Sequence, residues 1–329
     1  LLERQLKDKE IGPREREEVA YALSAYKRIF SQTPRLTQAI RALCTRFPLL
    51  SPTIRLVKHW FNSHLFAGHI KEELVELLAT RVFTQPHPFD PPSSVMVGFL
   101  RTLHFLSRWD WHQEPLVVDL GGELNQNVIE TIRTRFSAWR SIDPAMNTVA
   151  LFLASDIDHD GVTWTQYEMP PKVVAGRMST LAKASVKLLR EQGLSLNVSE
   201  LFHTSLAPYD FIINLRPKVL SDRILVPVKG RNAKSTVVES FVRDLQACFS
   251  QCMLLFYGGE HSDVIAGLWN PQAAKLKNWS LKMAYSTAPS DSKEQESDSV
   301  SINKTAILNE ISRLGMGLIE GVEVHHNKG

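Results

Sequence analysis

The sequence predicts an α+β protein, in which a mainly helical first part precedes a smaller part where helices and strands alternate. In the first part, apolar residues recur at helical spacing over several successive segments. In the second, short apolar or alternating runs separate the amphipathic helices. A chain of 329 residues, 43% of them hydrophobic, is long enough for two domains with separate cores. We therefore predict domains at residues 1–155 and 156–329.

Four apolar stripes at helical spacing predict a bundle of helices at the start of the chain. Their residues are Val19, Leu23, Tyr26 and Phe30; Leu36, Ile40, Leu43 and Phe47; Ile54, Val57, Phe61 and Leu65; and Leu74, Leu77, Leu78 and Val82. A loop with four prolines follows at 85–92, after which Ser93 or Ser94 can cap a further helix. Leu116 to Leu120 and Thr148 to Ala154 are strand candidates, and Asn125 begins a helix between them.

The second part begins with a long helix after Pro170 and Pro171. Tyr209 to Leu215 alternates as a strand, and the runs at 252–257 and 264–269 flank Gly258 and Gly259 as a hairpin. A Ser/Asp/Glu-rich insert near 288–303 is expected to be disordered, before a last helix at 305–314 and a strand at 321–325. This order predicts an α/β sandwich.

The overall charge excludes recruitment of nucleic acid by a global field. With 38 basic and 35 acidic side chains the net charge is +3, so any contact with RNA needs a local patch. Three cysteines, an odd number, are typical of a reducing compartment. No apolar run approaches the roughly 20 residues of a membrane span, so no membrane partner is expected. Because the chain begins at Leu1, we expect a piece of a longer protein.

The segment from Asp156 to Gly161 resembles the start of a calcium-binding EF-hand loop, because three aspartates alternate before a glycine. Position twelve of such a loop needs a bidentate glutamate but falls on Tyr167, with Glu168 one residue late. The preceding residues also read as a strand, where an EF-hand has a helix. We therefore expect a polar linker turn with solvated aspartates and no bound metal.

The same aspartates match a nucleotidyltransferase metal pair poorly. Such a pair also needs a Gly-Ser turn one helix upstream to hold the phosphates, and Gly121-Gly122-Glu123 lacks the serine. The scattered histidines and Gly258-Gly259 supply no metal or phosphate site either. The sequence thus offers no catalytic residue and no cofactor site.

Two clusters of basic residues are candidates for contact with RNA phosphates. The first is a loop-like stretch with few aspartates, comprising Arg216, Lys218, Arg223, Lys229, Arg231 and Lys234. The second surrounds Trp139 on one predicted helix and comprises Arg133, Arg135 and Arg140. An ordinary solvated face explains either cluster equally well.

Several segments resemble a known family. The helix at Leu50–Phe61 is similar to one in poly(A) polymerases, oligoadenylate synthetases and archaeal CCA-adding enzymes. Three later segments, at 162–182, 202–215 and 255–271, combine a tyrosine-aspartate strand with a glycine hairpin ending in Trp-x-Pro. In this order, from about Arg35 to His325, they resemble the last two domains of the Nrap family of nucleolar RNA-associated proteins.

The resemblance implies a poly(A)-polymerase/oligoadenylate-synthetase-like domain similar to the fifth Nrap domain, and an α/β tail similar to the sixth. It implies a catalytically inactive, pseudo-nucleotidyltransferase scaffold of the small-subunit processome in the nucleolus. The implied partners are pre-rRNA or a guide small nucleolar RNA, and processome proteins that include a subcomplex with casein kinase II. This sequence departs from the family in Glu260-His261-Ser262 of the hairpin and in its acidic insert.

Two alternatives remain open. The chain can be the accessory half of an active RNA nucleotidyltransferase whose catalytic domain lies upstream, which a Gly-Ser turn and an acidic pair before Leu1 would favour. It can also be a calcium-responsive binding module, in which case calcium would raise its stability.

Overall fold

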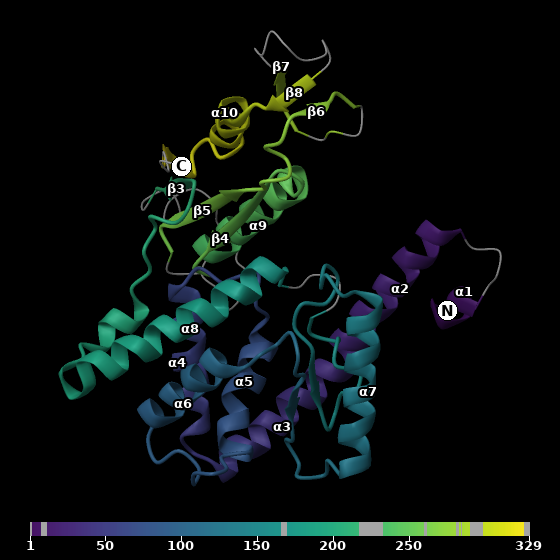
Figure 1. The fold of residues 1–329 in the computed structure, drawn as a ribbon, viewed down its shortest axis with the longest axis vertical. Coiled ribbons are helices and arrows are strands. Elements are labelled where there is room, and N and C mark those ends of the chain that lie inside the picture. The colour runs from purple at the N-terminus through teal and green to yellow at the C-terminus, as the bar shows by residue number, and fades with distance from the viewer. Residues whose placement is uncertain are drawn as a thin grey trace. The chain divides into compact units, whose positions relative to one another are not determined.

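The computed structural model describes residues 2–7, 12–165, 170–216, 233–259, 262–280, 283, 285–289 and 299–325. They form an α+β protein, as the sequence predicted (Figure 1). The chain divides into two compact units, one of residues 1–60 and 69–201 and the other of 61–68 and 202–329. The division falls after Leu201, whereas the sequence placed the boundary after Ser155. Among the described residues, no helix has both the length and the apolar character needed to cross a membrane.

The first unit is mainly helical, and its helices lie wholly within it except for the last three residues of α4, which belong to the second unit. The helices are α1 (Leu2–Lys7), α2 (Pro13–Lys27), α3 (Thr33–Arg46), α4 (Leu50–Ser63), α5 (Glu72–Thr84), α6 (Val95–Arg108), α7 (Gln126–Ile142) and α8 (Lys172–Gln192). A π-helical turn, Arg28–Gln32, joins α2 to α3. The stripes expected on α3, α4 and α5 are largely buried. The stripe on α2 is not, because Tyr26 and Phe30 are 57% and 67% exposed.

Two side-chain caps begin α6 and α7 where the sequence predicts them. The Ser94 hydroxyl accepts the Val97 N–H at 3.1 Å, and the Asn125 carbonyl oxygen accepts the Val128 N–H at 3.0 Å. Strands β1 (Leu116–Val118) and β2 (Leu153–Ser155) pair in parallel on either side of α7 in the sequence. Ile132 and Phe136 of α7 pack on Phe152 and Ala154. The result is a small β-α-β unit beside the helices.

Helix α8 packs along α6, and this explains why the first unit continues past residue 155. The buried side of α8 includes Val174, Met178 and Ala182. Two indole N–H groups also reach it: Trp60 Nε1 donates to Ser185 Oγ at 3.3 Å, and Trp111 Nε1 donates to Ser179 Oγ at 3.1 Å. Helix α8 is therefore part of the core of the first unit.

The second unit is built on an antiparallel sheet with the order β4-β5-β3-β9. Its strands are β3 (Phe211–Leu215), β4 (Met253–Tyr257), β5 (Val264–Trp269) and β9 (Ile319–Val324), and its helices are α9 (Ala233–Phe249) and α10 (Lys304–Leu314). Residues of both helices share one core with the same face of the sheet. The predicted hairpin at 252–269 is confirmed as β4 and β5.

A second sheet includes both ends of the insert that the sequence predicted to be disordered, so the prediction is wrong for those ends. Strands β6 (Lys277–Asn278), β7 (Thr287–Pro289) and β8 (Ser299–Ile302) pair in the order β6-β8-β7. Both ends of the insert expected near 288–303 are therefore strands, because Thr287 pairs with Ile302 and Pro289 with Val300. Residues 290–298 lie outside the described part of the chain.

A short segment from the first half of the chain completes the second unit. The Ala67 N–H donates to the Tyr257 carbonyl at 3.1 Å, which joins residues 61–68 to the end of β4. A Cβ atom on Gly258 would lie 2.7 Å from the Asn62 carbonyl oxygen. The glycine therefore permits this close backbone approach.

The two motifs that carry the family resemblance contact each other at the centre of the sheet. Asp210 accepts the Trp269 N–H at 2.7 Å, and its own N–H donates to the Gly267 carbonyl at 2.9 Å. The rings of Phe211 and Trp269 lie 5.0 Å apart. A Cβ atom on Gly267 would lie 2.0 Å from Cζ of Phe211, which is fully buried. These contacts join β3 to β5.

We expect Gly267→Ala to lower the free energy of unfolding by about 1–3 kcal/mol, because the buried Phe211 ring must move to admit the methyl group. The matched control is Gly176→Ala, at a helical glycine of α8 with open space around its Cβ position. It should raise stability by about 0.5–1 kcal/mol. Urea unfolding followed by tryptophan fluorescence measures both, and equal effects of the two changes would contradict this account.

Candidate nucleic-acid interface

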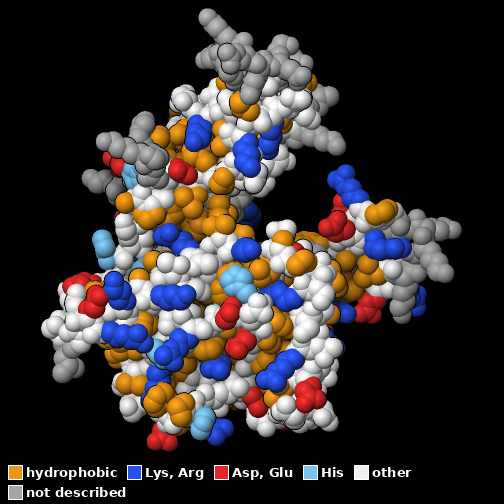
Figure 2. Space-filling view, in the orientation of Figure 1, with side chains coloured by type: hydrophobic (Ala, Val, Ile, Leu, Met, Phe, Trp, Pro, Cys, Tyr) orange, Lys and Arg blue, Asp and Glu red, His pale blue; other side chains and the backbone are white. Residues whose placement is uncertain are grey.

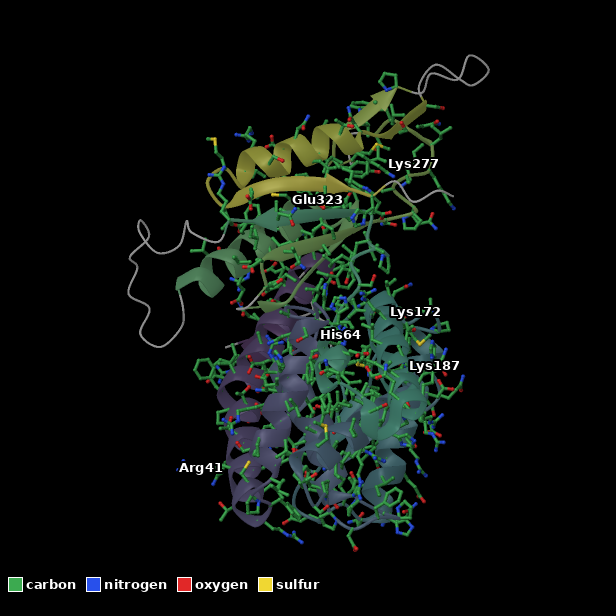
Figure 3. The ribbon with its side chains drawn as sticks, turned by 90° about the vertical axis from the view of Figure 1, so that its left-hand side faces the viewer. Arg41, His64, Lys172, Lys187, Lys277 and Glu323 are labelled. Carbon is green, nitrogen blue, oxygen red and sulfur yellow. The ribbon has the colours of Figure 1, made fainter. Side chains whose placement is uncertain are left out.

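A shallow basic groove of about 280 Å³ runs between α6 and α8 in the first unit. We call it the α6–α8 groove, and its lining residues are Ser107, Arg108, Lys183, Val186, Lys187 and Arg190. All four cationic side chains are exposed. Figure 2 shows Lys and Arg side chains gathered over these helices, and Figure 3 shows Lys172 and Lys187 on the same side of the first unit.

The spacing of basic residues along α8 produces this groove. Lys183, Lys187 and Arg190 recur at intervals of four and three residues, so they share one face of the helix. Seven lysines and arginines lie on the two helices, namely Arg101, Arg108, Lys172, Arg177, Lys183, Lys187 and Arg190. The two helices together contain one acidic residue, Glu191. Because α8 packs on α6, these positive charges lie close together, although the net charge of the whole chain is only +3.

The groove has a surplus of positive charge. In the described part of the chain, no carboxylate lies within ion-pair distance of Arg108, Lys183 or Arg190, and Lys187 contacts Glu191 at 3.6 Å. Burial, followed by the charges of Arg108 and Arg190, lowers the pKa of the nearby His104. His104 is therefore neutral at pH 7 and adds hydrogen-bonding capacity without further repulsion.

Such an arrangement is suited to a polyanion. Lysine and arginine side chains on a helical surface can follow a phosphate backbone, and this contact carries no sequence information. The cations in contact with phosphate would release counterions, so binding would weaken steeply with salt. Among the described residues, no aromatic side chain lines the α6–α8 groove, which suits backbone contact rather than base recognition.

The predicted basic stretch at 216–234 lies largely outside the described residues. This applies to Lys218, Arg223, Lys229 and Arg231 and to the side chain of Lys234. Arg216 is described, and its Nε donates to the Ile319 carbonyl at 3.0 Å. This contact ties the end of β3 to β9, and the stretch as a whole stays a prediction.

The predicted cluster on α7 divides into three different roles. Arg140 donates to four backbone carbonyls, those of Trp111, His112, Val149 and Ala150, at 2.8–3.1 Å. Burial lowers its pKa, and its guanidinium lies 4.7 Å from the centre of the Phe136 ring. Arg135 bonds Asp160 and the His159 carbonyl, each at 2.9 Å. Arg133 is exposed and lines a separate cavity. The structure therefore does not bring the three together as one RNA-binding surface.

The aspartates at 156–160 are less solvated than the sequence predicted, because Asp158 is buried and Asp156 is half-buried within the first unit, while Asp160 stays exposed. Asp156 accepts the N–H groups of Leu120 and Gly121 at 3.0 and 2.9 Å, which ties the ends of β1 and β2. Asp160 pairs with Arg135 at 2.9 Å. Asp158 is 4% exposed, and burial raises its pKa.

The carboxylates at 156–160 contact groups of the protein itself. Within the described ranges, no group of three or more His, Cys, Asp or Glu side chains is placed to hold a metal ion. Tyr167 and Glu168, at the far end of the loop, lie outside those ranges. Asp156 and Asp160 instead use their carboxylates on groups of the protein.

Sequence reasoning missed the α6–α8 groove because its two sides are distant in the sequence. Arg108 and Lys183 are brought together by helix packing alone. One signal was available: Lys183, Lys187 and Arg190 recur on one face of a predicted long helix with few acidic neighbours.

Three family models match successive parts of the chain. Residues 1–45 match the Nrap protein nucleotidyltransferase domain 4, residues 47–204 match the Nrap protein PAP/OAS1-like domain 5, and residues 206–322 match Nrap protein domain 6. The boundary between the last two matches agrees with the division of the structure after Leu201. The first 45 residues, which the sequence pattern joined to the fifth domain, match the fourth.

Full-length relatives match most of this chain. The U3 small nucleolar RNA-associated protein 22 of Schizosaccharomyces pombe is 29% identical over 311 residues, which cover 92% of this chain and 28% of that protein. Nucleolar protein 6 of Xenopus laevis is 28% identical over 88% of this chain, and that of Homo sapiens 28% over 90%. The chain spans about a quarter of the length of these relatives.

We expect Arg140→Gln to lower the free energy of unfolding by at least about 2 kcal/mol, because buried carbonyl groups lose a charged donor. Arg133→Gln is the control, since the exposed Arg133 lies on the same helix, and its effect should stay within about 0.5 kcal/mol. Urea unfolding measures both. Similar losses in the two variants would contradict a structural role for Arg140.

Burial raises the pKa of Asp158, so the folded state holds the proton on this carboxyl more tightly than the unfolded state does. The contribution of this carboxyl to stability is therefore complete below the ordinary pKa of 3.8 and is lost as pH rises through the higher folded value. Asp158→Asn should remove that loss, so its stability relative to the parent should increase as pH rises through this window. Thermal unfolding between pH 4 and pH 7 measures the difference, and a constant difference would rule out this titration.

Proposed function

Because the chain belongs to the Nrap family, we propose that it is a non-catalytic scaffold portion of a nucleolar ribosome-biogenesis factor that binds precursor rRNA through the α6–α8 groove. The names of its relatives support the setting. One is a U3 small nucleolar RNA-associated protein and another a nucleolar protein. In this proposal the whole protein acts in the small-subunit processome during rRNA processing.

The partners follow from the same proposal. They are pre-rRNA or the guide small nucleolar RNA, together with processome proteins that include a subcomplex containing casein kinase II. In this proposal the unit that matches the sixth domain, built on one core between its sheet and two helices, contributes protein contacts. RNA contact is assigned to the first unit, where the surplus cations lie.

The position of the carboxylates supports a role without catalysis. Asp119 and Asp156 directly follow the parallel strands β1 and β2, the place where a metal-binding pair would be sought. Asp156 accepts two backbone N–H groups, and Asp119 accepts those of Gly122 and Glu123 at 2.8 and 3.1 Å. Both carboxylates therefore stabilise the loops that follow the strands.

The observation that carries the proposal is the absence of carboxylate partners for Arg108, Lys183 and Arg190 in the described structure. Three cations confined to one groove repel one another, and a phosphate backbone relieves that repulsion. Their exposure leaves them accessible to a partner.

The test is the combined change of Lys183, Lys187 and Arg190 to glutamate. We expect weaker retention of single-stranded pre-rRNA segments, and a plot of log affinity against log salt that is flatter by roughly 0.7 for each phosphate that the variant no longer neutralises. Filter binding between 50 and 300 mM salt measures both quantities. Parent-like affinity and slope would contradict RNA contact at the groove.

Two matched variants complete the test. Changing Arg35, Arg41 and Arg46 of α3 to glutamate alters the net charge equally. These exposed residues are not part of the groove lining in the described structure, and Figure 3 shows Arg41 on the side opposite Lys187. This control should retain the parent slope. The combined change of Arg223, Lys229 and Arg231 to glutamate tests the predicted basic stretch. If only that variant flattens the slope, RNA contact belongs to the stretch rather than to the groove.

A further inference from the structure

A cavity of about 560 Å³ lies between α5, α6, β1 and α7, within the first unit. Its lining includes Arg81, Gln85, Phe105, Trp109, Glu114 and Arg133. The end of α6 serves both sites, since Phe105 and the C-cap residue Trp109 line this cavity and Arg108 lines the groove. The volume lies within the range of small-molecule sites in proteins.

One wall of the cavity is a column of stacked flat groups. The rings of Phe105 and Trp109 stack at 5.9 Å with an angle of 18° between their planes. The guanidinium of Arg81 lies 4.2 Å from the centre of the Phe105 ring. Trp109 Nε1 donates to the Glu114 carbonyl at 3.0 Å, which fixes the indole. The column thus extends from an indole to a guanidinium, and planar guanidinium groups stack well on nucleobases.

The positive charge of Arg81 is poorly compensated. Its side chain is partly buried, and burial lowers its pKa without an opposing charge that raises it. In the described residues no carboxylate lies within ion-pair distance of it, although a sequestered charge is costly unless it is paired. Arg133 of α7 adds a second cation to the same cavity. The two arginines therefore offer contacts for an anionic group of a ligand.

Hydrogen-bond acceptors line the cavity as well. Gln85 Oε1 is buried and accepts no hydrogen bond from the described residues. The carboxylates of Glu114 and Asp119 also belong to residues of the lining. A bare inorganic anion would contact the arginines and leave Gln85 Oε1 without a donor. A fitting ligand carries an anion, a flat ring and N–H or O–H donors together.

We propose that this cavity binds one nucleoside monophosphate unit, with its base stacked against Arg81, its phosphate near Arg133 and a donor of the base or ribose on Gln85 Oε1. The unit is either a free nucleotide or a single unstacked nucleotide of a bound RNA. The second source rests on the proposed RNA-binding function.

The first experiment titrates the 329-residue chain with AMP, GMP, CMP and UMP by isothermal calorimetry, with inorganic phosphate as the control ligand. We expect nucleotides to bind and phosphate to bind at least about tenfold more weakly, because stacking contributes only for the nucleotides. Arg81→Gln should weaken nucleotide binding by about tenfold or more. A folded parent that binds no nucleotide here, and none in the RNA arm below, overturns the proposal.

The chain offers a matched control for Arg81. Arg101 also lies over a phenylalanine ring, 4.8 Å from the centre of Phe89, and donates to a backbone carbonyl outside the cavity. Arg101→Gln should therefore keep the nucleotide affinity of the parent. Circular dichroism and thermal unfolding confirm that both variants are folded. Equal losses in the two variants would also overturn the proposal.

A second experiment separates the two sources. RNA oligonucleotides containing 4-thiouridine are crosslinked to the chain, and the attached peptides are mapped. Crosslinks at Phe105 or Trp109 that Arg81→Gln removes indicate an RNA nucleotide, and mononucleotide binding without them indicates a free nucleotide. If RNA binds through the α6–α8 groove but the cavity takes neither ligand, this inference alone fails. If no RNA binds but mononucleotides bind in an Arg81-dependent way, the proposed function fails and the cavity site stands.

Discussion

The packing of α8 along α6 is the constraint on which the first unit and its candidate sites depend. The buried face of α8 is apolar, and two indole N–H groups reach Ser179 and Ser185 on it, so the helix has one stable orientation against the core. This orientation turns Lys183 and Lys187 outward beside Arg108. Burial of one face of the helix therefore determines which charges collect on the other.

The residues that identify the family have structural rather than recognition roles. Asp210 and Gly267 lock β3 to β5, and Gly258 permits the close approach of the segment 61–68. Such positions allow few side chains because their neighbours are buried backbone and rings. They make the resemblance specific for the fold. The candidate interface lies elsewhere, on exposed charges whose positions the packing sets.

Local signals in the sequence predicted many of the elements. Ser94 and Asn125 cap the helices they precede, and the stripes of α3, α4 and α5 are largely buried. The remainder depended on tertiary contacts. Arg140 looked like one of three surface cations, yet it bonds carbonyls of two separate segments. Asp158 looked solvated but is buried, and Arg108 meets Lys183 only after folding. Contacts between distant segments leave no periodic trace in a single sequence.

The two candidate sites on either side of the last turn of α6 differ in their electrostatics. The cations of the α6–α8 groove are exposed, so salt at about 0.15 M screens them beyond roughly 8 Å and their contribution falls steeply with ionic strength. Arg81 is partly buried and stacked on Phe105, so its interaction with a base depends on a short contact that solvent screens less. In the proposed arrangement, the groove therefore attracts an RNA strand over a longer range, whereas the cavity selects one of its nucleotides only at contact.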